Sequence, residues 1–173
     1  YGAAGTGKTT LIKYISNMFC DARKLYITKT HTALQNVIRN LGKNFDNCDF
    51  EIIDSITRSN SAVVHDIVFI DECSTIDNRT MELLLGKISN DALIVMSGDV
   101  YQIESIDFGN WFFYAKDIVK AKGGSIELCS TWRTKKEELK GLWKAVREKS
   151  TIITEMLSMD GPFSENLGEN IFH

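Results

Sequence analysis

Residues 2–9 have the composition and spacing of a phosphate-binding loop. Gly2, Gly7, Lys8 and Thr9 occupy all four fixed positions of the pattern G-x-x-x-x-G-K-[ST]. Glycines let the backbone curl so that successive N–H groups point at phosphate oxygens. Lys8 would reach the β- and γ-phosphates, and the Thr9 hydroxyl would hold Mg²⁺. The predicted nucleotide-binding residues here are Gly2, Ala3, Ala4, Gly5, Thr6, Gly7, Lys8, Thr9 and Thr10.

Two adjacent carboxylates, Asp71 and Glu72, directly follow an apolar run that ends at residue 70. The carboxyl ends of strands are where open α/β sheets place their ligands. Asp71 would face Mg²⁺ through a water molecule, and Glu72 would polarise an attacking water as general base. A solvated turn is the alternative, but the apolar run and the upstream phosphate loop favour the catalytic interpretation.

A further candidate, Gln102, follows the apolar stretch that ends at Met96. Its amide can donate a hydrogen bond to a γ-phosphate or an attacking water and accept one in return. Taken by itself, Gln102 fits a plain loop amide better.

Composition limits the class of protein. The chain has 173 residues, enough for one domain with a full core, with 43% hydrophobic residues and a net charge of −3. No apolar run approaches the ~20 residues of a membrane span. The four cysteines lie far apart, which is typical of reduced thiols, so we expect a cytoplasmic protein without a membrane partner. Residues 116–149 are rich in Lys and Arg and could follow phosphates, although their alternating charge favours a solvated helix face.

Hydrophobic periodicity predicts alternating helices and strands, hence a parallel α/β sheet with helices on both faces. Helices are expected over 8–20, 31–41, 77–87, 111–119 and 134–149. Strands are expected over 25–28, 50–53, 66–70, 92–96 and 125–128. The aromatic residues between 108 and 112 could stack on bases, but their density favours a helix core.

Together these motifs resemble the first RecA-like motor domain of superfamily 1 helicases, especially the RecD and Dda-like branch. Residues 2–9 resemble motif I, 69–74 motif II and 98–102 motif III. Residues 28–33 are similar to motif Ia, with Lys29 where proline is common, and 54–57 resemble a short T-I-H-S segment. The resemblance implies nucleic-acid contacts by Thr28, Thr30, His31 and Thr57.

Residues 128–134 resemble the motif in which an arginine follows an aromatic residue. The resemblance implies that Trp132 stacks on adenine and that Arg133 reaches the γ-phosphate, and it makes Gln102 catalytic along with Lys8 and Glu72. The side chains suit these roles, because an indole has a broad π-face and a guanidinium binds phosphate bidentately.

The implied fold is a parallel-sheet P-loop NTPase of the RecA-like type, a three-layer sandwich. Its P-loop strand should lie between the strands that end near Ser97 and Leu128. Because only Tyr1 precedes Gly2, we expect that strand to be largely missing from this sequence. Residues 1–150 are expected to form the ATPase domain, and 151–173 to begin a linker toward a missing second motor domain.

The resemblance implies an ATP-dependent DNA helicase or translocase that uses ATP and Mg²⁺ to move on single-stranded DNA. A second RecA-like domain in the same full-length chain would be its partner. The alternative is a P-loop ATPase that switches or remodels a protein partner without translocation. Gln102 with Arg133 favours the helicase, while the low net charge and the altered motif Ia favour the alternative. A small-molecule kinase would need an acceptor lid, which the sequence does not offer.

Overall fold

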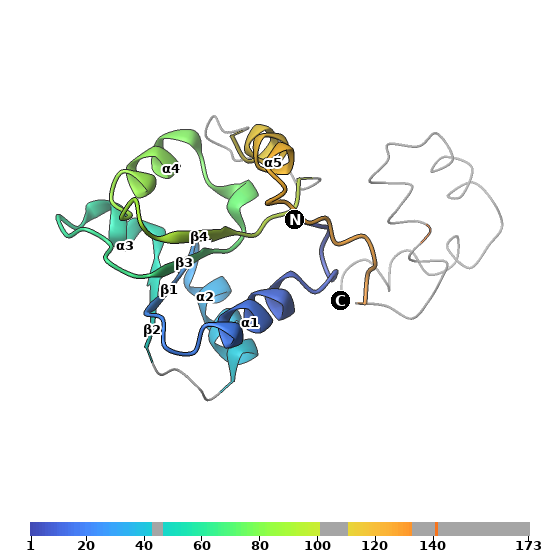
Figure 1. Cartoon of the computed structure of the whole chain (residues 1–173), viewed down its shortest axis with the longest axis horizontal. Coiled ribbons are helices and arrows are strands. Elements are labelled where there is room, and N and C mark those ends of the chain that lie inside the picture. Colours follow the sequence, from blue (N-terminus) through green and yellow to red (C-terminus); the bar gives the residue numbers. More distant parts are fainter. Residues whose placement is uncertain (43–46, 101–110, 133–140, 142–173) are drawn as a thin grey trace, which may run out of the picture. The chain divides into compact units, whose positions relative to one another are not determined.

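The computed structural model describes residues 1–42, 47–100, 111–132 and 141 (Figure 1). It divides into two compact units, Tyr1–Ser130 and Thr131–His173. The predicted helix over 134–149 and the predicted domain boundary at 150 lie outside the described residues. No helix within the described ranges is long and apolar enough to cross a membrane.

A four-stranded parallel sheet organises the first unit, in the order β2-β1-β3-β4. The strands are β1 (Lys24–Thr28), β2 (Cys48–Ile52), β3 (Ile67–Ile70) and β4 (Leu93–Met96). Because all pairs are parallel, the four carboxyl ends meet at one edge of the sheet. The loops that carry the predicted motifs Ia, II and III leave the sheet at this edge.

One face of the sheet is covered by α1 (Lys8–Met18) and α2 (His31–Leu41) (Figure 1). Ile12 of α1 and Val37 of α2 pack on alternate strand residues that point to this face. Tyr26 is stacked between two further aromatic rings, with centroids 5.1 Å from Phe50 and 4.7 Å from Phe69. This aromatic row ties three neighbouring strands together, because offset stacking adds to the gain from burial.

The opposite face is covered by α3 (Ile53–Arg58), α4 (Asn78–Leu85) and α5 (Trp111–Ala121), with a short 3₁₀ helix, η1 (Cys73–Thr75), beside α5. The core on this face comprises Leu25, Ile27, Ile53, Ile56, Val63, Val68, Ile70, Cys73, Ile76, Met81, Leu84, Ile88 and Phe112. Helices on both faces of a parallel sheet confirm the predicted three-layer sandwich.

Local signals in the sequence set the helix boundaries. Thr30 begins α2 by accepting a hydrogen bond from the Ala33 amide at 3.2 Å, and Gly42 ends it with a φ of 88°. Asp77 begins α4 in the same way, accepting from the Thr80 amide at 2.8 Å. The prediction of α2 over 31–41 is confirmed at both ends, whereas α3 was not expected.

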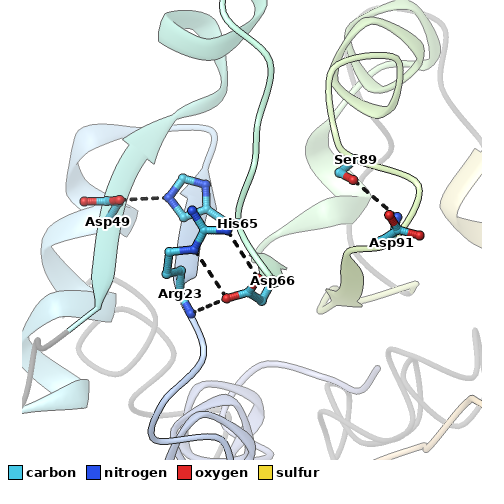
Figure 2. Close-up of polar contacts among 6 residues, drawn as sticks. All are labelled: Arg23, Asp49, His65, Asp66, Ser89 and Asp91. Carbon is cyan, nitrogen blue, oxygen red and sulfur yellow. Dashed lines mark hydrogen bonds and ion pairs between the residues drawn. The ribbon is translucent and has the colours of Figure 1, made fainter.

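Polar contacts fix the amino ends of the strands, at the edge opposite the motif loops (Figure 2). Arg23, just before β1, donates its backbone N–H to the Asp66 carboxylate, just before β3, at 2.8 Å. This backbone hydrogen bond is the main cause that lowers the pKa of Asp66, and the hydrogen bond from the Arg23 side chain lowers it further. His65 Nε2 lies 2.8 Å from the Asp49 carboxylate of β2. Figure 2 also shows Asp91, whose backbone N–H donates to the Ser89 hydroxyl in the turn before β4.

Tyr1 and Gly2 lie where the resemblance places the end of a P-loop strand. The Gly2 amide donates to the Gly98 carbonyl at 3.1 Å, and the Leu128 amide donates to the Tyr1 carbonyl at 2.8 Å. Among the described residues, the predicted strand over 125–128 is observed as a single parallel bridge, between Gly2 and Leu128. A groove of about 330 Å³ continues from there along β4, lined by Tyr1, Ile15, Leu93, Ile94, Val95, Met96, Phe112, Ala115, Lys116, Val119, Gly124, Ser125 and Ile126.

Candidate nucleotide-binding site

The loop over residues 2–9 has the backbone conformation that its glycines predict. Gly5 and Gly7 have φ values of 74° and 92°, in the left-handed region that glycine adopts without strain. Thr6 is buried, and its hydroxyl donates to the Ala3 carbonyl at 2.8 Å, which closes the turn. The Leu11 amide then donates to the Gly7 carbonyl at 2.9 Å and starts α1. The loop therefore leads into a helix N-terminus, whose free amides and dipole favour anions.

Gly2 is required by the close approach of another segment. A Cβ at Gly2 would lie 2.6 Å from the Leu128 carbonyl oxygen and 2.8 Å from the Thr6 hydroxyl oxygen. The first of these atoms belongs to the backbone and cannot move aside without shifting its segment. Gly2 thus positions the phosphate loop against residue 128, at the carboxyl edge of the sheet.

Lys8 reaches back across its own loop. Its ammonium donates to the Gly2 carbonyl at 2.8 Å and to the Ala3 carbonyl at 2.9 Å. A phosphate in the loop would offer this ammonium anionic oxygens in place of neutral carbonyls, and charge-assisted bonds of that kind are stronger. Among the other loop residues, Ala3 is buried, Thr9 is half-buried and Thr10 is exposed on the first turn of α1.

Asp71 and Glu72 follow β3 at the same edge. The Asp71 amide donates to the Ile27 carbonyl of β1 at 2.9 Å, and its carboxylate accepts from the Glu72 amide at 3.0 Å. Glu72 has a φ of 56°, a left-handed conformation that costs a residue with a Cβ about 1–2 kcal/mol. Strained backbone of this kind concentrates at functional sites.

The charges of Asp71 and Lys8 both act on the pKa of Glu72. Desolvation raises the pKa of Glu72 above its usual 4.5, the neighbouring Asp71 charge raises it further, and the Lys8 charge opposes both. A raised pKa suits a general base, because it brings the carboxylate nearer to the working pH.

The two predicted Mg²⁺ ligands fit that ion by their chemistry. Thr9 offers a hydroxyl and Asp71 a carboxylate, and Mg²⁺ prefers hard oxygen donors. Protein sites for Mg²⁺ typically supply one or two such ligands and leave the remaining positions to water and substrate phosphates. Asp71 is half-buried, with its Oδ1 already engaged by the Glu72 amide.

The segment after Glu72 joins the loops after β3 and β4. The Cys73 amide donates to the Ser97 carbonyl at 2.8 Å, and the Asp99 amide donates to the Ser74 hydroxyl at 3.3 Å. Burial raises the pKa of the Cys73 thiol, so this residue is a neutral core side chain. Motif II is therefore bonded to the segment after β4 twice, by a backbone bond to Ser97 and by the Ser74 hydroxyl to Asp99 of motif III.

The predicted nucleic-acid residues divide by exposure. Thr30 and His31 are exposed at the start of α2. Thr28 is fully buried, and its hydroxyl donates to the Thr30 carbonyl at 2.9 Å, so in this structure its side chain shapes the loop from within. The Thr57 hydroxyl donates back to the Ile53 carbonyl within α3 at 3.1 Å. Contact of these residues with nucleic acid stays a prediction.

Comparison with known proteins places the chain in a family. The model of the family described as the AAA domain matches residues 1–164. The chain belongs to the AAA domain family. The matched range includes the phosphate loop, the two carboxylates and the loop after β4, so the site lies wholly within the AAA domain.

Solved structures share the fold of this AAA domain. One of two Pif1 helicases coordinating at forked double-stranded DNA has a TM-score of 0.63 at 16% identity, covering 91% of this chain and 46% of that one. Pif1 helicase from Bacteroides, in complex with ADP-AlF3 and single-stranded DNA, has a TM-score of 0.57 at 15% identity, covering 90% and 43%. These likenesses confirm the predicted RecA-like P-loop NTPase fold, and the chain spans less than half of each neighbour.

An uncharacterized protein of Methanocaldococcus jannaschii, MJ1519, is 31% identical over 137 residues. The alignment covers 65% of this chain and 12% of that protein. The AAA domain described here therefore corresponds to a small part of this relative.

Three further predicted site residues are not tested by the described part of the first unit. Trp132 is exposed and belongs to the second unit, so its stacking on adenine stays a prediction. Gln102 and Arg133 lie outside the described residues. Trp111 and Phe112 belong to the core, as their density favoured: the Trp111 indole donates to the Ile76 carbonyl at 2.7 Å, and Phe112 is buried.

Sequence reasoning missed two contributors to the site. Ser74 holds the loop after β4, and Lys29 donates to the Thr75 carbonyl at 2.5 Å. A Ser after the acidic pair and a Lys in place of the usual proline were the signals in the sequence. Neither indicates its partner, because Ser74 contacts residue 99 and Lys29 contacts residue 75.

Proposed function

We propose that this AAA domain binds and hydrolyses ATP as the first motor domain of an ATP-dependent DNA helicase or translocase. The observation that carries the proposal is the phosphate loop, whose Lys8 ammonium reaches back to the Gly2 and Ala3 carbonyls, at the sheet edge where Asp71 and the strained Glu72 follow β3. An ammonium and two adjacent carboxylates lie at the edge where the phosphate loop enters its helix. That arrangement suits hydrolysis of a phosphoanhydride better than passive anion binding.

In this proposal each residue has a defined task. Lys8 and the loop amides bind the β- and γ-phosphates and stabilise charge that develops on them. Thr9 and Asp71 would hold Mg²⁺, which would neutralise phosphate charge. Glu72 accepts a proton from the attacking water. Gln102 and Arg133 contact the γ-phosphate, and Trp132 stacks on adenine.

The proposal extends to partners and location. Thr30 and His31, with the loop shaped by Thr28 and with Thr57 of α3, would contact single-stranded DNA. The Pif1 helicases of similar fold support DNA as the partner, since one was solved with single-stranded DNA. A second RecA-like domain of the full-length chain would complete the ATP site. The four free thiols are consistent with a cytoplasmic protein.

The test is the rate of ATP hydrolysis by the full-length protein with and without single-stranded DNA. Lys8→Ala serves as the background control, since it removes the phosphate-binding charge. We expect hydrolysis that depends on Mg²⁺ and rises with single-stranded DNA in the wild type, and neither effect in the variant. Hydrolysis that depends on Lys8 but ignores DNA and RNA would contradict the translocase and favour the protein switch. Full activity of Lys8→Ala would contradict the nucleotide site itself.

A further inference from the structure

The loop between β1 and α2 and the loop after Glu72 are joined by one side chain. Lys29 is exposed, and its ammonium donates to the Thr75 carbonyl at 2.5 Å. Thr75 ends η1 and bonds twice to Glu72: its amide donates to the Glu72 carbonyl at 3.0 Å, and its hydroxyl donates to the same carbonyl at 2.9 Å. A continuous path of hydrogen bonds therefore runs from Lys29 to the backbone of the predicted general base.

Both ends of this path are held in place locally. On the Lys29 side, Thr28 fixes the loop through its buried hydroxyl and Thr30 caps α2. On the Thr75 side, Cys73 and Ser74 bond to residues 97 and 99 after β4. A displacement of the Lys29 loop would therefore be transmitted to η1, because neither end can relax freely.

Charge supports the same placement. Burial acts to raise the pKa of Asp77, but hydrogen bonds from Thr80 and the nearby Lys29 charge outweigh it, so the pKa is lowered. The Lys29 ammonium thus contacts the Thr75 carbonyl, and its charge acts on Asp77, so both interactions are with the segment that follows Glu72.

We propose that Lys29 is a positioning residue that couples nucleic-acid binding at the loop over residues 28–31 to the placement of Glu72. The inference rests on the proposed function and adds to it the residue through which the two sites communicate. When nucleic acid moves the loop, Lys29 carries the movement to Thr75 and so to the backbone of Glu72. The coupling is reciprocal for binding, so ATP binding changes the affinity for DNA by the same factor.

The test measures the dissociation constant for single-stranded DNA in the full-length protein, with and without a non-hydrolysable ATP analogue and Mg²⁺. The ratio of the two constants is the coupling. We expect a wild-type ratio of about fivefold or more, since allosteric couplings are typically of that size. Lys29→Met, which keeps the aliphatic stem and loses the donor, should bring the ratio close to 1. Lys122→Met, at an exposed lysine just after α5, is the matched control and should leave the ratio unchanged.

A second variant tests the hydrogen bonds between Thr75 and Glu72 separately from the charge of Lys29. Thr75→Val removes the hydroxyl bond to the Glu72 carbonyl but keeps the Thr75 carbonyl that Lys29 contacts. It should reduce the coupling ratio without changing DNA affinity in the absence of nucleotide. Lys29→Arg keeps a charged donor and should restore part of the ratio.

Three outcomes would overturn the proposal. Lys29→Met could weaken DNA binding equally with and without the ATP analogue and lower the salt dependence of DNA binding by about one counterion. In that case Lys29 contacts a phosphate of the DNA instead. If the ratio stays at the wild-type value, the link carries no coupling. If the wild type itself shows a ratio of 1, this inference fails, whatever the variants do. Failure of the proposed function is recognised separately, as wild-type hydrolysis that DNA leaves unchanged.

Discussion

Gly98, in the loop after β4, lies against an aromatic side chain of α5 and admits no larger residue. A Cβ on Gly98 would lie 2.6 Å from Phe112 Cε1, 2.8 Å from Cζ and 3.1 Å from the Ser74 amide nitrogen. Real Cβ atoms essentially never approach other heavy atoms within 3.0 Å. The substitution Gly98→Ala must therefore displace the Phe112 ring or the loop itself.

The size of the effect follows from what has to move. Phe112 is buried and packs edge-on against Trp111 with ring centroids 5.5 Å apart, so its ring cannot swing into solvent without losing core contacts. Overpacking of this kind typically costs about 1–3 kcal/mol of the free energy of unfolding. For a chain of this length we expect the melting temperature to fall by roughly 2–12 °C.

Thermal and urea unfolding of Gly98→Ala, followed by circular dichroism, measures this effect. Gly86→Ala is the matched control, because Gly86 has helical backbone angles and its nearest atom would be 3.4 Å away. This control should be neutral or stabilised by up to about 1 kcal/mol. In a double-mutant cycle, Phe112→Leu should recover part of the loss, with a coupling of about 0.5 kcal/mol or more.

The reasoning is refuted if Gly98→Ala unfolds at the wild-type temperature and urea concentration. It is also refuted if Phe112→Leu and Gly98→Ala are strictly additive, because the clash would then involve other atoms. A loss as large for Gly86→Ala would point to a general effect of added methyl groups.

Three further predictions concern charge. Lys8→Ala in the full-length protein should abolish ATP hydrolysis in a phosphate-release assay, and retention of more than about a tenth of the activity would contradict the phosphate-loop assignment. Glu72→Gln should keep nucleotide binding and stop turnover. Because the pKa of Glu72 is raised in the folded state, the substitution should also stabilise the fold at neutral pH. That gain in stability should vanish as the pH falls through the raised pKa to below 4.5. Loss of nucleotide binding, or a gain that persists in acid, would count against it. Because the pKa of Asp66 is lowered in the folded state, the wild type should lose stability relative to Asp66→Asn as the pH falls from 3.8 through the lowered pKa. Urea titrations of the two proteins at each pH measure this difference, and a difference that does not change with pH would contradict the prediction.

Elements with complete local signals could be predicted from the sequence. The helix α2 has a capping Thr30, apolar residues on one face and Gly42 with a positive φ, and its predicted bounds match those observed. The phosphate loop and the acidic pair carry fixed spacings because their chemistry requires particular residues at particular positions. The positive φ values of Gly5 and Gly7 follow from their residue type, whereas nothing in the sequence indicates the φ of 56° at Glu72.

Elements that depend on distant partners could not be predicted. Helix α3 has six residues, too few for helical periodicity, and forms because Ile53 and Ile56 pack into the core. Residues 125–128 are apolar enough for a strand, yet their partner segment supplies one bridge. The contact of Lys29 with Thr75 spans 46 residues, and no local pattern encodes it.

The central claim is that residues 2–9, Asp71 and Glu72 form a nucleotide-phosphate site. The most direct measurement is a crystal structure of the full-length protein with Mg²⁺ and a non-hydrolysable ATP analogue. We predict that the loop amides donate hydrogen bonds to phosphate oxygens, and that Mg²⁺ lies between the Thr9 hydroxyl and the Asp71 carboxylate. We also predict that the Lys8 ammonium leaves the carbonyls of Gly2 and Ala3 for the β- and γ-phosphates. A nucleotide bound elsewhere, or a Lys8 ammonium still on those two carbonyls beside a bound nucleotide, would contradict the claim.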